Sequence, residues 1–501
     1  MNEKDNITRL SSGPNFEKAI NTFIDHIESL STSLPHILST IEQTKQKALK
    51  LHQEFLNKDC EKKIGENGIY FAIKPEHARR NRLLRKEVNQ SIIAHTIIQR
   101  NYIVSLVSQF DSFIGSLIRT MYYVKPELLN ESEKQLTFSN LLEFENVAAA
   151  REFIIEKEIE SVLRDSHTGH FKWIEKKIDS PLLKDLPIWS TFIELTERRN
   201  LYVHNNGVVS NHYLKMCNDN NVTLSPDIQI GDTLIVDADY FDKAFKCVFE
   251  LGLKLAQVMW RKLMPNNLLD ADNNLLSISF ELILSCQYTL AQEILDFTEK
   301  YIKKFSSDDI KFRLILNRAQ TYKWIGEQEK CKEIIKSKDW SACSDIFRLA
   351  SQVLLDDFES AAKTMRILGK DHKEIDKNAY KEWPIFKEFR KQQNFKKCFE
   401  ELFAEEVEIK ERYASSGFKI IDITTFEKIL DDCLKIAQEK TNGFLSSKFF
   451  VETHVSQKGY DIGSTWEIYN KLEHNNKIQT YKHVDPNGKF PPINAVRRIV
   501  K

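Results

Sequence analysis

The feature that most constrains this chain is the repetition of apolar residues at three- and four-residue steps over long stretches with few helix breakers. This period places the apolar side chains on one face of an α-helix. Only 15 Gly and 12 Pro occur in 501 residues, which favours long helices over many short strands. We therefore predict a mostly α-helical fold. The clearest stripes are Phe16, Ile20, Phe23, Ile27, Leu30 and Leu34, and then Ile103, Val107, Phe110, Ile114, Leu117 and Met121.

These stripes predict helices over residues 15–57 and 90–124, and Pro35 marks an expected kink or boundary in the first. Between them, residues 64–76 predict a short extended segment. The run TLIV at 233–236 is typical of a short strand, and Asp237 or Asp239 is a suitable N-cap for the helix that follows. Further helices are expected at 147–165 and 188–204.

The length of 501 residues predicts more than one domain. We expect a helical domain at 1–264 with a short extended insertion, a helical-repeat solenoid at 270–404, and a connector with a small α/β-containing module at 405–501. Within 270–404, helical pairs recur about every 33 residues, close to the spacing of tetratricopeptide units. The units begin near Asn274, Asp309 and Ser341. Stacked repeats of this kind leave a concave surface for a protein partner or trigger.

The charges of the chain balance, with 72 Lys and Arg against 72 Asp and Glu. Nucleic acid must therefore be bound by a local basic patch and not by a global field. The basic run HARRNRLLRKE supplies one candidate, in which Arg79, Arg80 and Arg82 contact RNA phosphates. The alternative, which is more common for such a run, is a solvated helix face.

Two absences in the sequence bear on the environment of the protein. No stretch of about 18 uninterrupted apolar residues occurs, so no membrane span or membrane partner is expected. The eight cysteines lie far apart without a CxxC pair, which is typical of reduced thiols and not of a disulfide framework or zinc ribbon. We therefore predict a cytoplasmic protein.

Arg199 and His204 are separated by four residues, but spacing alone has little weight. The pairs Arg164–His170 and Arg366–His372 have a similar spacing. The surrounding run RRNLYVHNNGVVSNHYL is more informative. Asn200 follows the arginine and Asn205 follows the histidine. The sequence Asn205–Gly207 then predicts the end of a helix.

This run resembles the motif of HEPN ribonucleases of the abortive-infection type, and the segment QFDSFIGSLIRTMYYVKPELL resembles an earlier HEPN helix, with Asp111 after an aromatic residue. The resemblance covers residues 15–264. It implies a bacterial anti-phage or toxin-like endoribonuclease that cuts tRNA or other cellular RNA without a metal or cofactor. It also implies a homodimer in which two motifs face one cleft. Asn206 stands where toxins that pair with a nucleotidyltransferase antitoxin have a tyrosine, so that pairing is not expected.

The chemistry of metal-free RNA cleavage fits these residues. His204 exchanges protons near neutral pH, and Arg199 offers a fixed set of donors to a phosphate. Asn200 and Asn205 are expected to orient the imidazole or bind the phosphate, Asp111 to hydrogen-bond Arg199, and Arg198 to add a weak RNA contact. Five helical steps give about 140° of rotation and about 7.5 Å of rise, so the two side chains of one chain do not lie together.

Two alternatives remain open at this stage. Arg199 and His204 can instead form a structural ion pair or cap at a helix end, in a scaffold that binds RNA or protein without cleaving it. His167 and His170, taken together with Asp165, lack a complete set of metal ligands, so we interpret them as part of a surface loop.

Overall fold

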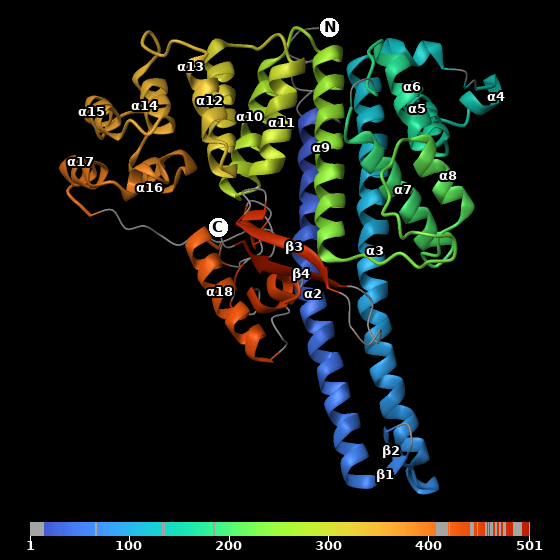
Figure 1. Ribbon diagram of the computed structural model, residues 1–501. Coiled ribbons are helices and arrows are strands. Elements are labelled where there is room, and N and C mark those ends of the chain that lie inside the picture. The colour runs from blue at the N-terminus through green and yellow to red at the C-terminus, as the bar shows by residue number, and fades with distance from the viewer. Residues whose placement is uncertain are drawn as a thin grey trace. The chain divides into compact units, whose positions relative to one another are not determined.

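The computed structural model describes residues 15–65, 68–132, 134, 136–183, 186–406, 419, 421–440 and, in short stretches, parts of 445–499. These residues form a mostly helical fold with two antiparallel two-stranded sheets, as Figure 1 shows. The chain divides into two compact units, Met1–Pro265 and Asn266–Lys501, with the boundary inside the sequence MPNN. Among the described helices, none is both long and apolar enough to span a membrane.

The first unit is built on two long helices that lie side by side, α2 (Phe16–Asp59) and α3 (Ala78–Val124) (Figure 1). Strands β1 (Glu61–Gly65) and β2 (Gly68–Ala72) form a hairpin between them, so the expected extended segment exists but begins earlier than predicted, and η1 (Pro75–His77) occupies its predicted end. Helix α3 begins earlier than predicted because the basic run is itself helical. Of the two alternatives predicted at Pro35, a kink or a boundary, the boundary is wrong. Helix α2 continues through it, since a proline removes only one backbone donor and the helix has buried residues on both sides.

The far halves of α2 and α3 extend past the other helices of the first unit (Figure 1). We call residues 36–59 of α2 and 78–98 of α3, with the hairpin between them, the α2–α3 arm. Few of its side chains are buried, and those on α2 are Ala48 and Phe55. Apolar side chains of the arm are instead exposed, as a set: Ile37, Leu49, Leu51, Leu83, Ile92, Ile93 and Ile97.

Helix α3 is central to the rest of the first unit, because α2, α5, α7 and α9 all pack on it. The ring of Phe23 stacks on Phe113 with centroids 4.1 Å apart, in contact with Gly252 of α9. Short helices α4 (Phe138–Leu141), η1 (Pro75–His77) and η2 (Pro126–Glu131) complete the connections. The main bounds are α5 Val147–Leu163, α6 His167–Ile178, α7 Trp189–His204, α8 Asn211–Asp219 and α9 Ala238–Leu263.

Two predictions about the segment before α9 have different outcomes. Asp237 is the N-cap of α9 and accepts a hydrogen bond from the backbone N of Tyr240, as expected. The predicted strand at 233–236 is wrong, because Thr233 makes only a single bridge to Val208. The apolar residues of this run are buried as a loop against the bundle instead: Leu234 and Val236.

The second unit begins with helical pairs, as predicted. Their first helices start at residues 269, 308 and 345, so the repeats are 39 and 37 residues apart, longer than the predicted period of about 33. The extra length lies in the loops 302–307 and 337–344 that join successive pairs. The helices are α10 Leu269–Leu284, α11 Tyr288–Tyr301, α12 Asp308–Ile325, α13 Gln328–Lys336, α14 Asp345–Leu354, α15 Phe358–Leu368, α16 Lys377–Glu382 and α17 Gln393–Phe403, with short turns η3 Pro384–Phe386 and η4 Phe389–Lys391.

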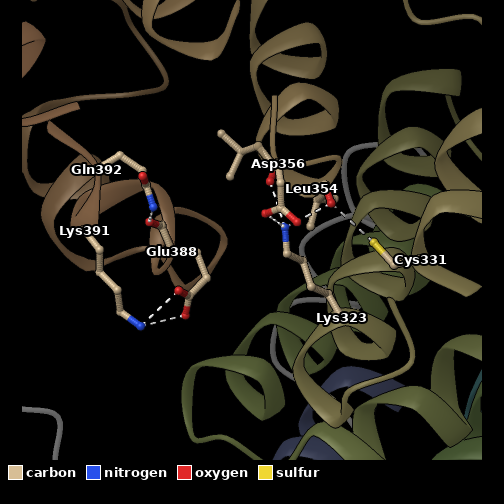
Figure 2. A network of polar contacts seen from close by, with 8 residues as sticks. Lys323, Cys331, Leu354, Asp356, Glu388, Lys391 and Gln392 are labelled. Carbon is tan, nitrogen blue, oxygen red and sulfur yellow. Dashed lines mark hydrogen bonds and ion pairs between the residues drawn. The ribbon is translucent and has the colours of Figure 1, made fainter. Parts of the chain in front are cut away.

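A buried lysine joins two of these pairs. Lys323 of α12 donates from Nζ to the carbonyl oxygens of Val353 and Leu354, at 2.9 and 3.0 Å, and to Asp356 at 2.6 Å (Figure 2). These carbonyls lie at the carboxyl end of α14, where a positive charge is favourable. The thiol of Cys331 also points to the Leu354 carbonyl. The same view includes the ion pair of Lys391 with Glu388 on the turn η4.

The last described residues form helix α18 (Ile423–Lys440), a π-helical turn (Phe449–Val455) and the strands β3 (Ile478–His483) and β4 (Ile493–Arg498). The two strands pair antiparallel, and Arg498 of β4 binds Asp431 and Glu427 of α18. This confirms helical and extended patterning in the predicted C-terminal module. Residues 407–418 of the predicted connector lie outside the described residues.

Candidate functional site

Helix α7 ends directly after His204 in a tight backbone turn. The carbonyl of Leu201 accepts hydrogen bonds from the backbone N of Asn205 and of Gly207, at 2.8 and 2.9 Å. Asn206 and Gly207 have φ angles of 51° and 79°, the left-handed conformation that ends helices. The helix end predicted at Asn205–Gly207 is therefore confirmed. A Cβ at position 207 would lie only 2.9 Å from the Tyr202 ring, so glycine is required there.

The turn is held in place from α3. Arg100 donates from Nη1 to the carbonyl oxygen of Asn206 at 2.9 Å, and its guanidinium lies 5.5 Å from the centre of the Tyr202 ring. Arg100 therefore fixes the backbone two residues after His204. The sequence analysis missed this residue, because nothing in the local pattern links positions that are 106 residues apart.

Asp111 of α3 is shared by two cationic or polar partners from different helices. Its Oδ2 lies 3.3 Å from Nη2 of Arg199, which confirms the contact expected from the sequence. Its Oδ1 lies 2.8 Å from Nε2 of His167 on α6. The Arg199 side chain is 23% exposed, and its Nε is buried without a hydrogen-bond partner in the described part of the chain.

His204 is exposed at the end of α7, and its ring makes no hydrogen bond or ion pair with the described residues. Asn205 donates from Nδ2 to the carbonyl oxygen of Val208 at 2.8 Å, so this amide closes the loop and does not orient the imidazole. Asn200 is half-buried. Within one chain Arg199 pairs with Asp111, and no contact among the described residues joins it to His204, in agreement with the helical geometry.

The prediction that Arg198 contacts RNA is wrong. Its side chain is buried, donates from Nε to Glu194 at 2.6 Å, and stacks on the Tyr240 ring at 3.9 Å. Tyr213 and Tyr240 also donate to Glu194, at 2.7 and 2.8 Å. Burial, together with the charge of Glu194, raises the pKa of both phenols well above their usual value. These buried contacts of Arg198 anchor α7 to the bundle. Arg199, at the next helical position, points in a different direction.

The basic residues Arg79, Arg80 and Arg82 lie exposed on the first turns of α3. Arg80 pairs with Asp59 at 3.0 Å and lies over the Phe55 ring. Arg82 precedes Asp111 by 29 residues on the same helix, which corresponds to about 43 Å along its axis. The structure therefore does not bring this cluster to the Arg199 site of the same chain.

His167 and His170 do not belong to a surface loop, so that prediction is wrong. Both lie on α6, and the side chain of His170 is buried at 2% exposure. The carboxylate grouped with them is that of Asp111 on α3, and the ligand-type atoms of the three residues lie within 4.8 Å of one another. The sequence could not indicate this grouping, because Asp111 is 56 residues away from His167 on another helix.

Comparison of the chain with protein-family models, curated proteins and solved structures found no match. The function must therefore be argued from the residues and their geometry.

Proposed function

We propose that this protein is a metal-independent endoribonuclease of the HEPN type, with Arg199 and His204 as the catalytic residues. The observation that carries the proposal is the contrast between the two side chains. The imidazole of His204 is exposed without a described partner at a backbone turn fixed by Arg100, and Arg199 is oriented one turn earlier by Asp111. A free base and an oriented cation are two of the three groups that cleavage at a 2′-hydroxyl requires, and the third is a proton donor.

In this mechanism His204 accepts the proton of the ribose 2′-hydroxyl as its oxygen attacks the adjacent phosphorus. The bond from phosphorus to the 5′-oxygen breaks, and a protonated His204 of the second copy supplies the proton to that leaving oxygen. The products are a 2′,3′-cyclic phosphate and a 5′-hydroxyl. Arg199 donates to the phosphate oxygens, on which negative charge increases in the transition state.

The unit of function in this proposal is a homodimer, because one chain does not bring Arg199 and His204 together. The exposed isoleucines of the α2–α3 arm support self-association. A pair of long helices with so few buried side chains lacks the apolar packing from which helical stability in proteins mainly comes. Two such arms packed together form a four-helix arrangement that buries those residues.

The wider role follows from the same resemblance. The enzyme acts on tRNA or other cellular RNA as an anti-phage or toxin-like effector in the cytoplasm. The helical pairs of the second unit, tetratricopeptide-like in this proposal, bind the protein partner or trigger that controls the nuclease. Their support is the stacking of successive helical hairpins α10 to α15.

The test uses the full chain with total tRNA and mRNA in EDTA, and compares wild type with Arg199→Ala and His204→Ala. Arg164→Ala and His372→Ala are matched controls, since Arg164 is highly exposed at the end of α5 and His372 lies outside the first unit. We expect wild type and controls to leave 2′,3′-cyclic phosphate ends, and the two site variants to lose about 100-fold or more of the rate. Equal cleavage by all five proteins contradicts the proposal. RNA binding without cleavage by any of them supports the scaffold alternative.

A further inference from the structure

The group of Asp111, His167 and His170 has a use that RNA cleavage does not explain. His167 and His170 lie three residues apart on α6, so both rings project from the same face of the helix. Their ring centroids are 5.1 Å apart, and Asp111 approaches from α3. A tetrahedral ion with ligands about 2.1 Å away holds its ligand atoms about 3.4 Å apart. The three ligand-type atoms here, within 4.8 Å of one another, reach that spacing by small side-chain rotations.

His170 supplies an independent indication that a ligand belongs in this group. Its side chain is 2% exposed, and neither ring nitrogen makes a hydrogen bond. A buried polar atom without a partner costs about 1–3 kcal/mol, and a bound ion is one interaction that would offset this cost at His170.

Asp111 is oriented in the way that metal-binding carboxylates are. Its Oδ2 is bound by the guanidinium of Arg199, so Oδ1 is the oxygen that faces the two histidines. Hydrogen-bond partners such as this guanidinium fix the orientation of a metal-binding carboxylate, and they are a regular part of metal sites. Phe192 packs edge-on against the His167 ring at 5.2 Å, and this apolar wall strengthens electrostatic interactions beside it.

We propose that Asp111, His167 and His170 bind one divalent transition-metal ion, with Zn²⁺ as the best match. Two imidazole nitrogens and one carboxylate oxygen are ligands that Zn²⁺ accepts, whereas Mg²⁺ and Ca²⁺ prefer oxygen alone. Three protein ligands leave a fourth position for water. The ion joins α3 to α6 through the carboxylate that also orients Arg199. This site goes beyond the proposed nuclease activity, which needs no metal.

The experiment uses the untagged full chain, stripped with EDTA and then freed of it. We expect one equivalent of Co²⁺ to bind with visible d–d absorption, and one equivalent of Zn²⁺ to displace it. His167→Ala, His170→Ala and Asp111→Asn should each weaken Co²⁺ binding at least tenfold. His212→Ala, an exposed histidine outside the group, should bind as wild type does.

Circular dichroism of the ion-free variants establishes that each is folded, and His167→Ala keeps the test decisive if removal of the buried His170 prevents folding. Wild type that binds no Co²⁺ at millimolar concentration overturns the proposal. So does a folded His167→Ala variant that binds Co²⁺ as tightly as wild type. Both outcomes are measured without RNA, so they are independent of cleavage in EDTA.

Discussion

At the scale of single residues, two adjacent arginines of α7 have opposite environments. Arg198 lies in a buried network with Glu194, Tyr213 and Tyr240, whereas Arg199 reaches the partly exposed Asp111. A step of 100° around the helix separates a side chain that stabilises the fold from one that faces solvent and a possible substrate. The two positions should therefore respond differently to the same substitution.

We expect Arg198→Ala to destabilise the protein by about 3–5 kcal/mol, because it leaves the Glu194 carboxylate buried without its cation. Arg199→Ala should cost within about 1 kcal/mol, since its ion pair is partly exposed. Thermal unfolding of the full chain, followed by circular dichroism, measures both. Equal melting temperatures for the two variants would contradict the assignment of Arg198 to the core.

A second prediction concerns pH and the start of α18. Asp422 accepts hydrogen bonds from the backbone N of Thr425 at 2.9 Å and from its hydroxyl. Burial alone raises the pKa of Asp422, but these hydrogen bonds outweigh it and lower the pKa below its usual value of 3.8. The carboxylate therefore stabilises the helix at pH values above about 4. This contribution is lost as the pH falls through the lowered folded pKa.

Asp422→Ala should reduce the hydrogen-exchange protection of the first turn of α18 at pH 7 by about 1 kcal/mol, the usual effect of losing an N-cap. Near pH 3 the difference from wild type should shrink. Asp432→Ala, an exposed acid on the same helix, is the control and should leave protection unchanged. A difference that is independent of pH would exclude the carboxylate as the cause.

The candidate site was only partly predictable from sequence, because several of its contacts join residues that are far apart along the chain. The helix end after His204 depends on local residues, so the run Asn205–Gly207 indicated it correctly. The direction of Arg198 and Arg199 depends on which face of α7 meets the bundle, which one sequence does not specify. Arg100 and His167 reach the site across long sequence separations, so no local pattern revealed them.

At the scale of elements, the period of apolar residues was a reliable guide wherever a helix buries one face. It indicated α2, α3, α5, α7 and α9, because each packs one stripe against neighbours. The apolar pattern was unreliable for residues that are buried without being in a helix or strand. The run at 233–236 is apolar because it packs as a loop. The helix breaker Pro35 was also a poor guide, since packing on both sides of it maintains α2.

The packing of α9 on the first two helices gives a prediction at this scale. A Cβ at Gly252 would lie 2.6 Å from the Phe23 ring and 3.3 Å from the Phe113 ring. Gly252→Ala should therefore destabilise the first unit by about 1–3 kcal/mol, although alanine is the better helix former.

Gly115→Ala is the matched control for this substitution. Gly115 is also a buried helical glycine, but its nearest contacts, at 3.3 and 3.5 Å, are farther than the 2.6 Å contact at Gly252, so we expect a much smaller effect. Thermal unfolding compares the two variants. A higher melting temperature for Gly252→Ala than for wild type would show that α2 and α3 can move to accept the methyl group.

At the scale of the whole molecule, the α2–α3 arm predicts self-association. Its exposed isoleucines should be covered by a second copy, so sedimentation should show a dimer whose population rises with protein concentration. Ile93→Glu and Ile97→Glu together should shift the protein to monomer and lower cleavage in parallel. Ile367→Glu, at an exposed isoleucine on α15 in the second unit, should leave the dimer intact. A monomeric wild type at all concentrations would contradict the shared site.

The contact of Arg100 with Asn206 also has a consequence for how the protein folds during synthesis. The chain must close a loop of 106 residues before this hydrogen bond forms, and one of 88 residues before Asp111 meets Arg199. Closing long loops is entropically unfavourable until other contacts compensate. A nascent chain on the ribosome, with only α2 and α3 emerged, therefore carries no assembled centre. In this proposal, an RNA-cutting protein cannot damage the translation machinery until its first unit is complete.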